Sequence, residues 1–232
     1  MACGPIKRHP PAHAGHGGFS KPTAVRRYLL MPEKPHTSMS LDREKSELRE
    51  TAQAVRRRSA EESGPHAAAS LSDHLVARFG YLGGHAVSGY LAIGTEIDVA
   101  PALARLEQAG LHATLPVVTS REQSLTFRRW TAGTQLEPGP LRTRHPVAGS
   151  PEMVPDLLII PMLAFDANGY RIGWGGGFYD RTLAKLRVKK EVIAIGAAFA
   201  AQQVDKIPRD HHDARLDWIA TEKGLIEITP DT

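Results

Sequence analysis

The sequence predicts an α/β domain in which helices cover both faces of a largely parallel β-sheet. Short apolar runs of strand length alternate with stretches of helical periodicity from residue 41 onward, and strands separated by helices form parallel sheets. The chain has 232 residues and is 41% hydrophobic, so it can bury a core of single-domain size. It contains no internal repeat, and we therefore expect one folded domain.

Two helices are expected at the start of this domain. Apolar side chains recur at helical spacing over residues 41–59, and again around Leu71, Leu75 and Phe79. The Ser-Gly-Pro segment at residues 63–65 separates the two patterns, because glycine and proline both disfavour a helix interior. The apolar residues 87–93 then predict the first strand.

The later elements continue the alternation. Residues 101–109 predict a short helix, with a proline at its start and Gly110 as its stop signal. Apolar runs predict strands over residues 113–118, 124–130, 157–163, 192–199 and 216–221, and residues 178–186 predict a helix. The Pro- and Gly-rich residues 136–155 are expected to be a connection without regular structure.

The positive charge of the chain is concentrated in its first 38 residues. They contain six lysines and arginines against one acid, a net charge of +5, whereas the remaining residues carry a net charge of −1. The overall pI of about 9.3 therefore describes the leader more than the domain. A near-neutral domain is a poor match for a nucleic-acid binder, and we expect no nucleic-acid partner.

Residues 1–38 are expected to be a disordered basic leader, and residues 39–232 the folded domain. The leader is rich in Pro, Gly and His and has no sustained hydrophobic period. We expect Met39 to be the native start; the alternative is an organellar transit peptide. The single cysteine, Cys3, suits a reducing compartment, and no apolar run is long enough to span a bilayer. The expectation is a cytoplasmic protein with no membrane partner.

A glycine-rich loop lies between the buried strand at residues 157–163 and the helix at residues 178–186. Its four glycines are Gly173, Gly175, Gly176 and Gly177. Glycines allow positive φ angles and let a ligand approach the backbone N–H groups. The helix N-terminus adds partial positive charge and unpaired donors, so the order of elements favours a phosphate site.

Two common phosphate-binding motifs are absent from the sequence. The loop begins like the dinucleotide fingerprint G-x-G-x-x-G, but Phe178 occupies the place of the last glycine. No G-x-x-x-x-G-K-[ST] motif occurs anywhere in the chain. On the glycines alone, a flexible turn that leads into a helix is as good an interpretation as phosphate binding.

The whole segment closely resembles the signature of the 5-formyltetrahydrofolate cyclo-ligase family, also called methenyltetrahydrofolate synthetases. The matching residues of the core are Pro161, Ala164-Phe165-Asp166, Gly169, Arg171 and Gly173 to Asp180. Further matches, in the family's order, are Lys45, Leu48 and Arg49, Glu96-Ile97-Asp98, Leu115-Pro116, Gln203-Val204, Pro208 and His212-Asp213. The resemblance covers residues 40 to about 221 and implies a three-layer α/β/α fold.

The resemblance implies an ATP- and Mg²⁺-dependent enzyme that converts 5-formyltetrahydrofolate to 5,10-methenyltetrahydrofolate, with release of ADP and phosphate. The ATP-binding residues that it implies are Lys45, Arg49, Arg171, Ile172, Gly173, Trp174, Gly175, Gly176, Gly177, Phe178 and Tyr179. The implied contacts with the reduced folate are Glu96, Leu91, Trp174 and Tyr179. Asp180 and Asp213 are the implied Mg²⁺ ligands, consistent with the oxygen ligands that this ion prefers.

Most of these residues can also be explained by a purely structural role. Lys45 and Arg49 lie one helical turn apart, as solvated charges often do. Asp180 is placed to complement the helix dipole, and Asp213 to cap a turn. Leu91 and Phe178 are as suited to a core as to a ligand, and Glu96 as suited to an exposed loop. A non-catalytic nucleotide-binding module therefore remains the alternative to an enzyme.

The sequence departs from the family pattern at two places. Many relatives have a glutamate before the proline in the loop that precedes the buried strand, where this chain has Arg144-His145-Pro146. A threonine often follows the E-[IV]-[DE] motif, and Val99 stands there instead.

Overall fold

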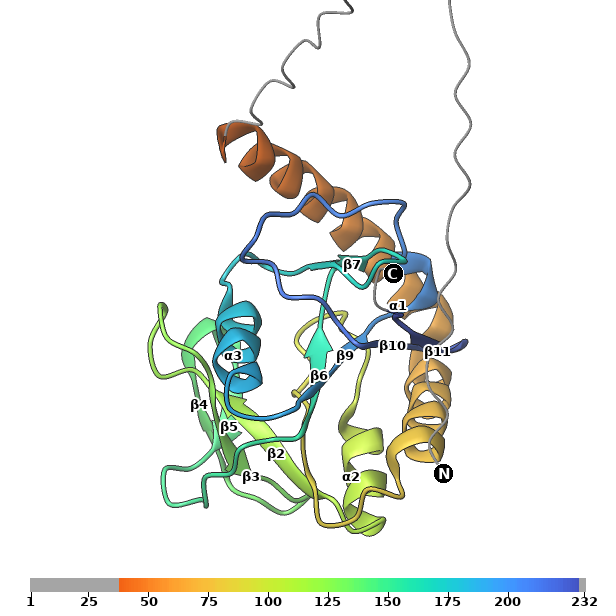
Figure 1. Cartoon of the computed structure of the whole chain (residues 1–232). Coiled ribbons are helices and arrows are strands. Elements are labelled where there is room, and N and C mark those ends of the chain that lie inside the picture. The colour runs from red at the N-terminus through yellow and green to blue at the C-terminus, as the bar shows by residue number, and fades with distance from the viewer. Residues whose placement is uncertain (1–37, 230–232) are drawn as a thin grey trace, which may run out of the picture. The chain divides into compact units, whose positions relative to one another are not determined.

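The computed structural model describes residues 38–229 (Figure 1). The predicted leader lies outside the described residues except for Ser38, at which the first helix begins. The helices are α1 (Ser38–Phe79), α2 (Ala100–Gln108) and α3 (Phe178–Arg187), with the 3₁₀ turns η1 (Pro140–Arg142) and η2 (Ala200–Gln202). The strands are β1 (Ala86–Ser88), β2 (His112–Val117), β3 (Thr126–Arg129), β4 (Leu136–Pro138), β5 (Arg144–Pro146), β6 (Leu157–Pro161), β7 (Ala164–Phe165), β8 (Arg171–Ile172), β9 (Ile193–Ala197), β10 (Trp218–Thr221) and β11 (Gly224–Glu227).

The central sheet has seven strands in the order β11-β10-β9-β6-β1-β2-β3. Its five inner strands are parallel to one another, and only the edge strands β3 and β11 are antiparallel to their neighbours. The prediction of a largely parallel α/β sheet is confirmed. Within the described residues, no helix combines the length and the apolar character needed to cross a membrane.

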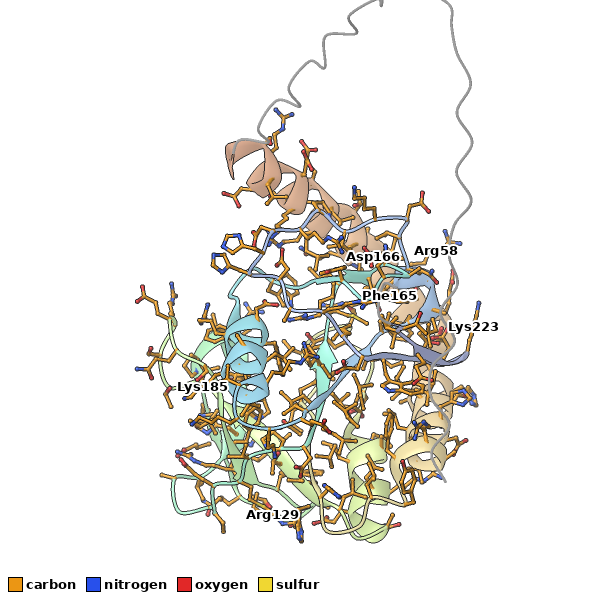
Figure 2. All side chains as sticks on the ribbon, viewed as in Figure 1. Arg58, Arg129, Phe165, Asp166, Lys185 and Lys223 are labelled. Carbon is orange, nitrogen blue, oxygen red and sulfur yellow. The ribbon has the colours of Figure 1, made fainter. Side chains whose placement is uncertain are left out.

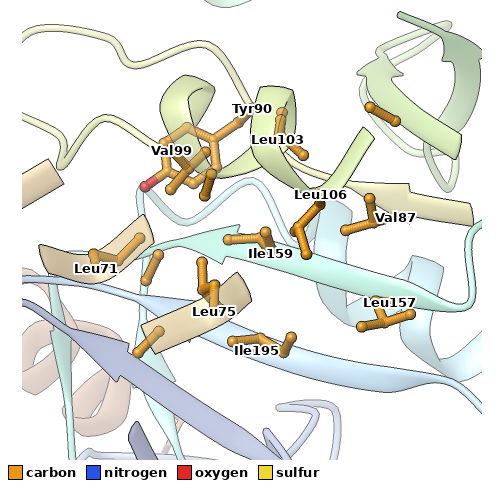
Figure 3. Close-up of a cluster of buried hydrophobic side chains, with 14 of the residues drawn as sticks. Leu71, Leu75, Val87, Tyr90, Val99, Leu103, Leu106, Leu157, Ile159 and Ile195 are labelled. Carbon is orange, nitrogen blue, oxygen red and sulfur yellow. The ribbon is translucent and has the colours of Figure 1, made fainter. Parts of the chain in front are cut away.

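The sheet is the middle of three layers because its strands bury alternate side chains on opposite faces. In β6, Leu157 and Ile159 join the core beneath α1 and α2, whereas Leu158 and Ile160 join the core beneath α3. Figure 3 shows the first of these cores, where Ile159 lies among side chains of both helices. Figure 1 shows α3 on one side of β6 and α2 on the other. The three-layer fold is therefore confirmed.

The first two predicted helices follow one another directly in α1. α1 bends at Gly64, where φ is 48° and ψ is −150°, and Pro65 follows without an N–H to donate. The predicted break is confirmed: Gly64 is not helical, and the two halves of α1 are separate helices that meet at this kink. The second half packs on the sheet through Leu71 and Leu75, and the first half packs over the small β7–β8 sheet.

Some short strands were not predicted, and one predicted strand is shorter. β1 ends at Ser88 rather than at residue 93 because the chain leaves the sheet beneath α2, and its apolar residues pack there. The connection at residues 136–155 contains the β4–β5 hairpin. Strands of two to four residues, such as β7, β8 and β11, are too short to show a clear alternation.

The β7–β8 hairpin carries the chain from the buried strand β6 to the glycine loop. Its turn is held by Asp166, which is 1% exposed. The Asp166 carboxylate accepts hydrogen bonds from the backbone amides of Asn168, Tyr170 and Ile207, at 3.0 Å each. Figure 2 shows Asp166 beside Phe165 in β7. A buried carboxylate with three amide donors ties the base of the glycine loop to a second segment of the chain.

Candidate active site

The candidate site lies where segments after two neighbouring parallel strands meet. β1 and β6 pair directly, and their carboxyl ends lead to the 89–98 segment and to the β7–β8 hairpin. The side chain of Trp174 in the glycine loop lies beside the Glu96 carboxylate of the first segment, and it acts to lower the pKa of that carboxyl. Crevices at the carboxyl ends of parallel strands are the usual ligand sites of open α/β sheets. Glu96 and the glycine loop therefore lie together at this edge of the sheet.

The glycine loop presents a run of backbone donors. Among the described residues, no acceptor receives a hydrogen bond from the amides of residues 173–177. α3 starts directly after them and adds the free N–H groups of its first turn. Gly175 and Gly177 have left-handed φ angles of 90° and 63°. A loop of unpaired amides at a helix N-terminus is suited to bind an anion such as phosphate.

The four glycines do not share one conformational role. Gly173 and Gly176 do not have left-handed φ angles, so this freedom is used only by Gly175 and Gly177 among the four. A Cβ atom on Gly176 would stand 2.7 Å from the ring of Phe178, so this glycine is needed for space. A Cβ atom on Gly173 would meet nothing within 4 Å. Gly173 therefore leaves open space beside the loop in the ligand-free protein.

Two arginines hold the glycine loop through hydrogen bonds to its backbone carbonyl groups. Arg49 Nε in α1 donates to Gly173 O at 2.9 Å, and a Cβ atom on Gly175 would stand 3.1 Å from Arg49 Nη2. Arg181 Nη2 in α3 donates to Gly176 O and to Arg121 O, both at 2.8 Å. Arg49 is thus at the predicted place, while Arg181 was not predicted. Because Arg181 lies one turn into a helix, the sequence pattern assigns it to a solvated face.

Arg171 and Asp180 form an ion pair at the start of α3. The Arg171 side chain is 7% exposed, and its Nη2 atom lies 2.7 Å from Asp180 Oδ1. Arg171 Nη1 donates to Ala214 O at 2.6 Å, and the Ala214 amide donates to Asp180 Oδ1 at 3.1 Å. The pair therefore joins the glycine loop and α3 to the 205–217 segment.

Lys45 forms a second cluster of charges with the same segment. Its Nζ atom lies 2.7 Å from Asp213 Oδ2 and 3.2 Å from Asp210 Oδ2. The Asp210 amide also donates to Asp213 Oδ2 at 2.8 Å. The two carboxylates raise the pKa of Lys45 against the opposing effect of burial, and they hold it charged. Asp210 was not predicted, because it lies outside the H-D pair of the motif.

The two predicted Mg²⁺ ligands each have one carboxylate oxygen in use. Asp180 Oδ1 and Asp213 Oδ2 take the contacts described above, and within residues 38–229 no hydrogen bond engages Asp180 Oδ2 or Asp213 Oδ1. No group of three or more metal-ligating side chains occurs in that range. Mg²⁺ often binds through only one or two carboxylates together with substrate phosphates and waters. The free oxygens therefore fit a metal that arrives with a nucleotide.

Glu96 is a buried carboxylate rather than an exposed loop acid. Its side chain is 7% exposed, its Oε2 atom accepts from the Ile93 amide at 2.9 Å, and its Oε1 atom lies 3.5 Å from Arg56 Nη1. Burial raises the pKa of Glu96, whereas the Ile93 amide, Arg56 and Trp174 act in the opposite direction. A carboxylate held in this way is a strong acceptor for N–H groups of a ligand.

The other predicted residues divide between the site and the core. Tyr179 is half-buried, and burial followed by the charge of Glu96 raises its pKa, which places its hydroxyl near that carboxylate. Phe178 packs against the core beneath α3, with Arg181 5.2 Å from its ring centroid. Ile172 is buried in β8, and Leu91 packs against the core beneath α1 and α2. Side-chain roles for Phe178, Ile172 and Leu91 in binding remain predictions.

A cavity of about 530 Å³ opens beside Glu96. It lies between the kink of α1, the 94–98 segment, Pro101 and Phe199, and it is lined mainly by apolar side chains. None of Leu91, Trp174 and Tyr179 is among the residues that line it. This volume is within the range of small-molecule pockets, so Glu96 borders enough space for part of a ligand.

The two departures from the family pattern have structural counterparts. His145 is buried in β5 directly opposite Glu137 of β4, and Glu137 Oε1 lies 3.4 Å from His145 Nδ1 and 3.2 Å from Arg128 Nη1. A carboxylate of the neighbouring strand therefore faces His145. Val99 is the N-cap residue of α2 and makes no side-chain cap; Asp98 Oδ1 accepts from the Ala100 amide instead.

Arg56 is the third basic residue of α1 at this site, and it was missed. Its side chain is 5% exposed, and it contacts both Glu96 and the ring of Trp174. The sequence contains a signal, because Lys45, Arg49 and Arg56 are separated by four and seven residues and so share one helical face. Two neighbouring arginines, at positions 57 and 58, obscured this signal by suggesting a solvated cluster.

Comparison with known proteins agrees with this geometry. The chain is 32% identical over 148 residues to the 5-formyltetrahydrofolate cyclo-ligase of Escherichia coli K12, which covers 62% of this chain and 81% of the relative. It is 31% identical over 159 residues to the enzyme of that name from Mycolicibacterium smegmatis, covering 63% and 79%. A mitochondrial relative from Arabidopsis thaliana is 34% identical over 107 residues, covering 41% of this chain and 38% of the relative.

Solved structures show the same fold. The NMR structure of Aquifex aeolicus 5,10-methenyltetrahydrofolate synthetase superimposes with a TM-score of 0.63 at 26% identity, covering 81% of this chain and 94% of that one. The synthetase from Mycoplasma pneumoniae has a TM-score of 0.61 at 22% identity, covering 77% and 98%. The sequence profile of the family matches residues 42–222, which include the charged residues and the glycine loop of the site. The chain belongs to the 5-formyltetrahydrofolate cyclo-ligase family.

Proposed function

We propose that the protein converts 5-formyltetrahydrofolate to 5,10-methenyltetrahydrofolate and hydrolyses ATP to ADP and phosphate in the process. Membership of the family makes the chain a ligase. The observation that carries the specific reaction is the meeting of two recognition elements: a loop of unpaired amides suited to phosphate, and a buried carboxylate suited to a ring with N–H donors. The Trp174 side chain connects the two, so both ligands would bind within one site.

The reaction requires activation of a poor leaving group. The formyl oxygen attacks the γ-phosphorus of ATP, the bond to the β,γ-bridging oxygen breaks, and ADP leaves. The N10 lone pair then attacks the formyl carbon, and the phosphorylated oxygen departs as phosphate while N10 loses its proton. Phosphoryl transfer needs mainly alignment and neutralisation of charge on the phosphate oxygens. The protein therefore needs donors and cations more than a nucleophile.

The residues of the site supply these donors. The amides of residues 173–177 would bind phosphate oxygens, with Arg49 and Arg181 holding the loop in shape. Arg171 and Lys45 are paired with carboxylates, and in this proposal each cation would also donate to a phosphate oxygen. In this assignment Lys45 and Arg171 neutralise charge, and the loop aligns the γ-phosphate with the formyl oxygen.

The charge balance supports a requirement for Mg²⁺. Lys45, Arg49, Arg171 and Arg181 carry four positive charges, and Asp180, Asp210 and Asp213 carry three negative charges. ATP, with about four negative charges, would therefore enter a site whose net positive charge is much too small to balance it. The free oxygens of Asp180 and Asp213 would hold Mg²⁺, which would supply the missing positive charge.

Turnover of the purified full chain tests this function. We expect methenyl absorbance in the near ultraviolet to appear when 5-formyltetrahydrofolate, ATP and Mg²⁺ are all present. Omission of any one of the three should abolish the signal, and ADP should form in equal amount to the methenyl product. Binding of ATP without methenyl product would instead identify a non-catalytic nucleotide-binding module.

Glu96 provides a test of the folate site. Glu96→Gln replaces an ionised acceptor by an amide that presents a donor to another donor, at a cost of about 1.5 to 3 kcal/mol in folate binding. ATP binding should barely change, because the proposed phosphate donors are the backbone amides of residues 173–177, none of which hydrogen-bonds to Glu96 in the described part of the chain. Since burial raises the pKa of Glu96, folate affinity of the wild type should fall on acidification at a higher pH than an ordinary glutamate would titrate. The same loss should be absent from the variant.

Calorimetric titration of each ligand into both proteins measures this asymmetry. Glu107→Gln is a matched control. Glu107 is a half-buried acid of α2, and its Oε1 atom lies 2.9 Å from Arg129 Nη2. That variant should bind both ligands like the wild type. Equal losses of folate and ATP affinity in Glu96→Gln would point to a general structural defect, and an unchanged folate affinity would remove Glu96 from the site.

A further inference from the structure

Arg56 occupies a position that packing of α1 alone does not explain. It is a buried arginine on the first half of a helix whose other arginines at positions 57 and 58 are exposed. Its Nε atom donates to Thr95 Oγ1 at 3.2 Å, and its Nη1 atom lies 3.5 Å from Glu96 Oε1. The centre of its guanidinium lies 5.4 Å from the ring centroid of Trp174. One side chain thus connects α1, the 89–98 segment and the glycine loop.

Burial of the Arg56 charge costs free energy, so stability alone does not explain an arginine at this position. An ion pair that is removed from water is seldom more stable than apolar side chains of the same volume. Apolar side chains are common nearby, since Ala52 and Ala60 on the same helix pack into cores. A guanidinium offers what they lack: a permanent charge and donors in a plane, which can bind a carboxylate and stack on an aromatic ring at once.

We propose that Arg56 is a positioning residue for the folate substrate: it keeps the Glu96 carboxylate ionised and oriented, and it holds Trp174 of the glycine loop next to it. This inference rests on the proposed function, in which Glu96 accepts hydrogen bonds from the substrate ring. Arg56 itself does not touch the substrate in this arrangement. It acts through two residues that do.

The groups around Glu96 support this role. A carboxylate has about four positions for hydrogen-bond donors. The Ile93 amide and Arg56 each use one, and the Trp174 side chain lies beside the same carboxylate. The other titratable neighbours are Tyr90 and Tyr179, and the charge of Glu96 raises the pKa of both hydroxyls. Asp98 acts on Tyr90 in the same direction. Arg56 is therefore the cation that offsets the burial of Glu96 among the described residues.

The exposed fractions of Trp174 and Arg56 indicate how a substrate would reach Glu96. The Trp174 residue is 60% exposed, whereas Arg56 is 4% exposed. Trp174 can therefore turn away and yield its position on Glu96 to an N–H group of the ring, while Arg56 keeps the acceptor charged and in place. A stacked guanidinium also limits how far the indole moves, which would couple the arrival of folate to the glycine loop.

Arg56→Met tests the proposal, with Arg56→Lys as the conservative variant. Arg56→Met removes the cation from a buried carboxylate, so the pKa of Glu96 rises and the neutral form, a poor acceptor, is populated at higher pH. We expect KM for 5-formyltetrahydrofolate to rise about tenfold at pH 8 and further at pH 6, with a small change in KM for ATP. Arg56→Lys should regain part of the loss and most of the pH dependence of the wild type.

The matched control is Arg58→Met. Arg58, labelled in Figure 2, lies two residues further along α1 and is exposed. Its Nε atom lies 2.7 Å from Glu62 Oε1, one turn later on the same helix. This variant removes the same charge from the same helix and should keep both KM values and their pH profile. A similar pH profile in Arg56→Met and Arg58→Met would overturn the proposal.

A second measurement does not depend on activity. Protein labelled with ¹³C at glutamate carboxyls allows the Glu96 signal, identified by its loss in Glu96→Gln, to be titrated by NMR. We expect it to titrate at higher pH in Arg56→Met than in the wild type; an unchanged titration would overturn the proposal even if the enzyme were inactive.

The double variant Arg56→Met/Glu96→Gln removes both charges and should have a higher melting temperature than Arg56→Met. This result would show that Arg56→Met is destabilised by the unpaired Glu96 charge and not by a general packing defect. If the wild type shows no turnover, but the Glu96 signal still titrates at higher pH in Arg56→Met than in the wild type, the proposed function is rejected and the electrostatic role of Arg56 is kept.

Discussion

Asp180→Asn should reduce kcat/KM for Mg²⁺-ATP by about 10² to 10³-fold while the protein still folds cooperatively. The Oδ1 atom of Asp180 makes both protein contacts, with Arg171 Nη2 and the Ala214 amide. An asparagine oxygen can keep both of these hydrogen bonds. The amide nitrogen then takes the position of Oδ2, where it cannot bind a cation, and the charge of the side chain is lost. The affected step is therefore the binding of metal and phosphate.

Steady-state rates over a series of Mg²⁺ concentrations measure this effect, with melting curves as the check on folding. Asp217→Asn is the control, because Asp217 Oδ2 also accepts from an arginine, Arg187 at 2.8 Å, and from a backbone amide, Ala194 at 2.7 Å. Asp217 lies outside the proposed metal site, and its variant should have a normal Mg²⁺ dependence. A Mg²⁺ titration curve of Asp180→Asn that matches the wild type would exclude Asp180 as a ligand.

Gly173→Ala should leave the melting temperature unchanged and reduce kcat/KM for ATP by about 100-fold. The new methyl group would meet nothing within 4 Å, and the residue does not need a left-handed φ angle. The ligand-free protein therefore has no reason to change. If the open space beside the loop is where phosphates bind, the methyl group displaces them from the amides, and a displacement of about 1 Å is enough for such a loss.

Gly149→Ala is the control for this substitution. Gly149 is exposed, its added Cβ atom would also meet nothing within 4 Å, and it is far along the chain from the glycine loop. Melting temperature and kinetics should both stay at wild-type values in that variant. Calorimetric titration with ATP separates binding from chemistry for Gly173→Ala. Normal ATP binding by Gly173→Ala would show that phosphates do not bind beside Gly173.

The elements with long and regular patterns were predictable, and those that depend on neighbours were not. β6 and β9 are apolar runs flanked by turn signals, and both were expected within two residues of their observed ends. β1 was expected to continue to residue 93, because the apolar residues after Ser88 look the same in the sequence whether they pack in a sheet or under a helix. The β4–β5 hairpin has prolines in both strands, which conceals it.

The candidate site was predicted through its family motif, and the tertiary structure changed the meaning of several residues. Lys45, Arg49 and Glu96 looked like surface charges on local grounds, yet each is paired with a partner more than 30 residues away in the chain. Phe178, which also follows from the motif, packs into the core beneath α3. Arg56, Arg181 and Asp210 were missed because they lie outside the family motif.

The sequence by itself determined the α/β class, the position of the glycine loop before α3, and the family, because all three depend on order and spacing along the chain. Only the tertiary structure decided which charges are buried and which carboxylate each cation meets. Those contacts join α1, the 89–98 segment and the 205–217 segment to the glycine loop. The electrostatics of a site depend on distance and burial, which the packing of the whole domain sets.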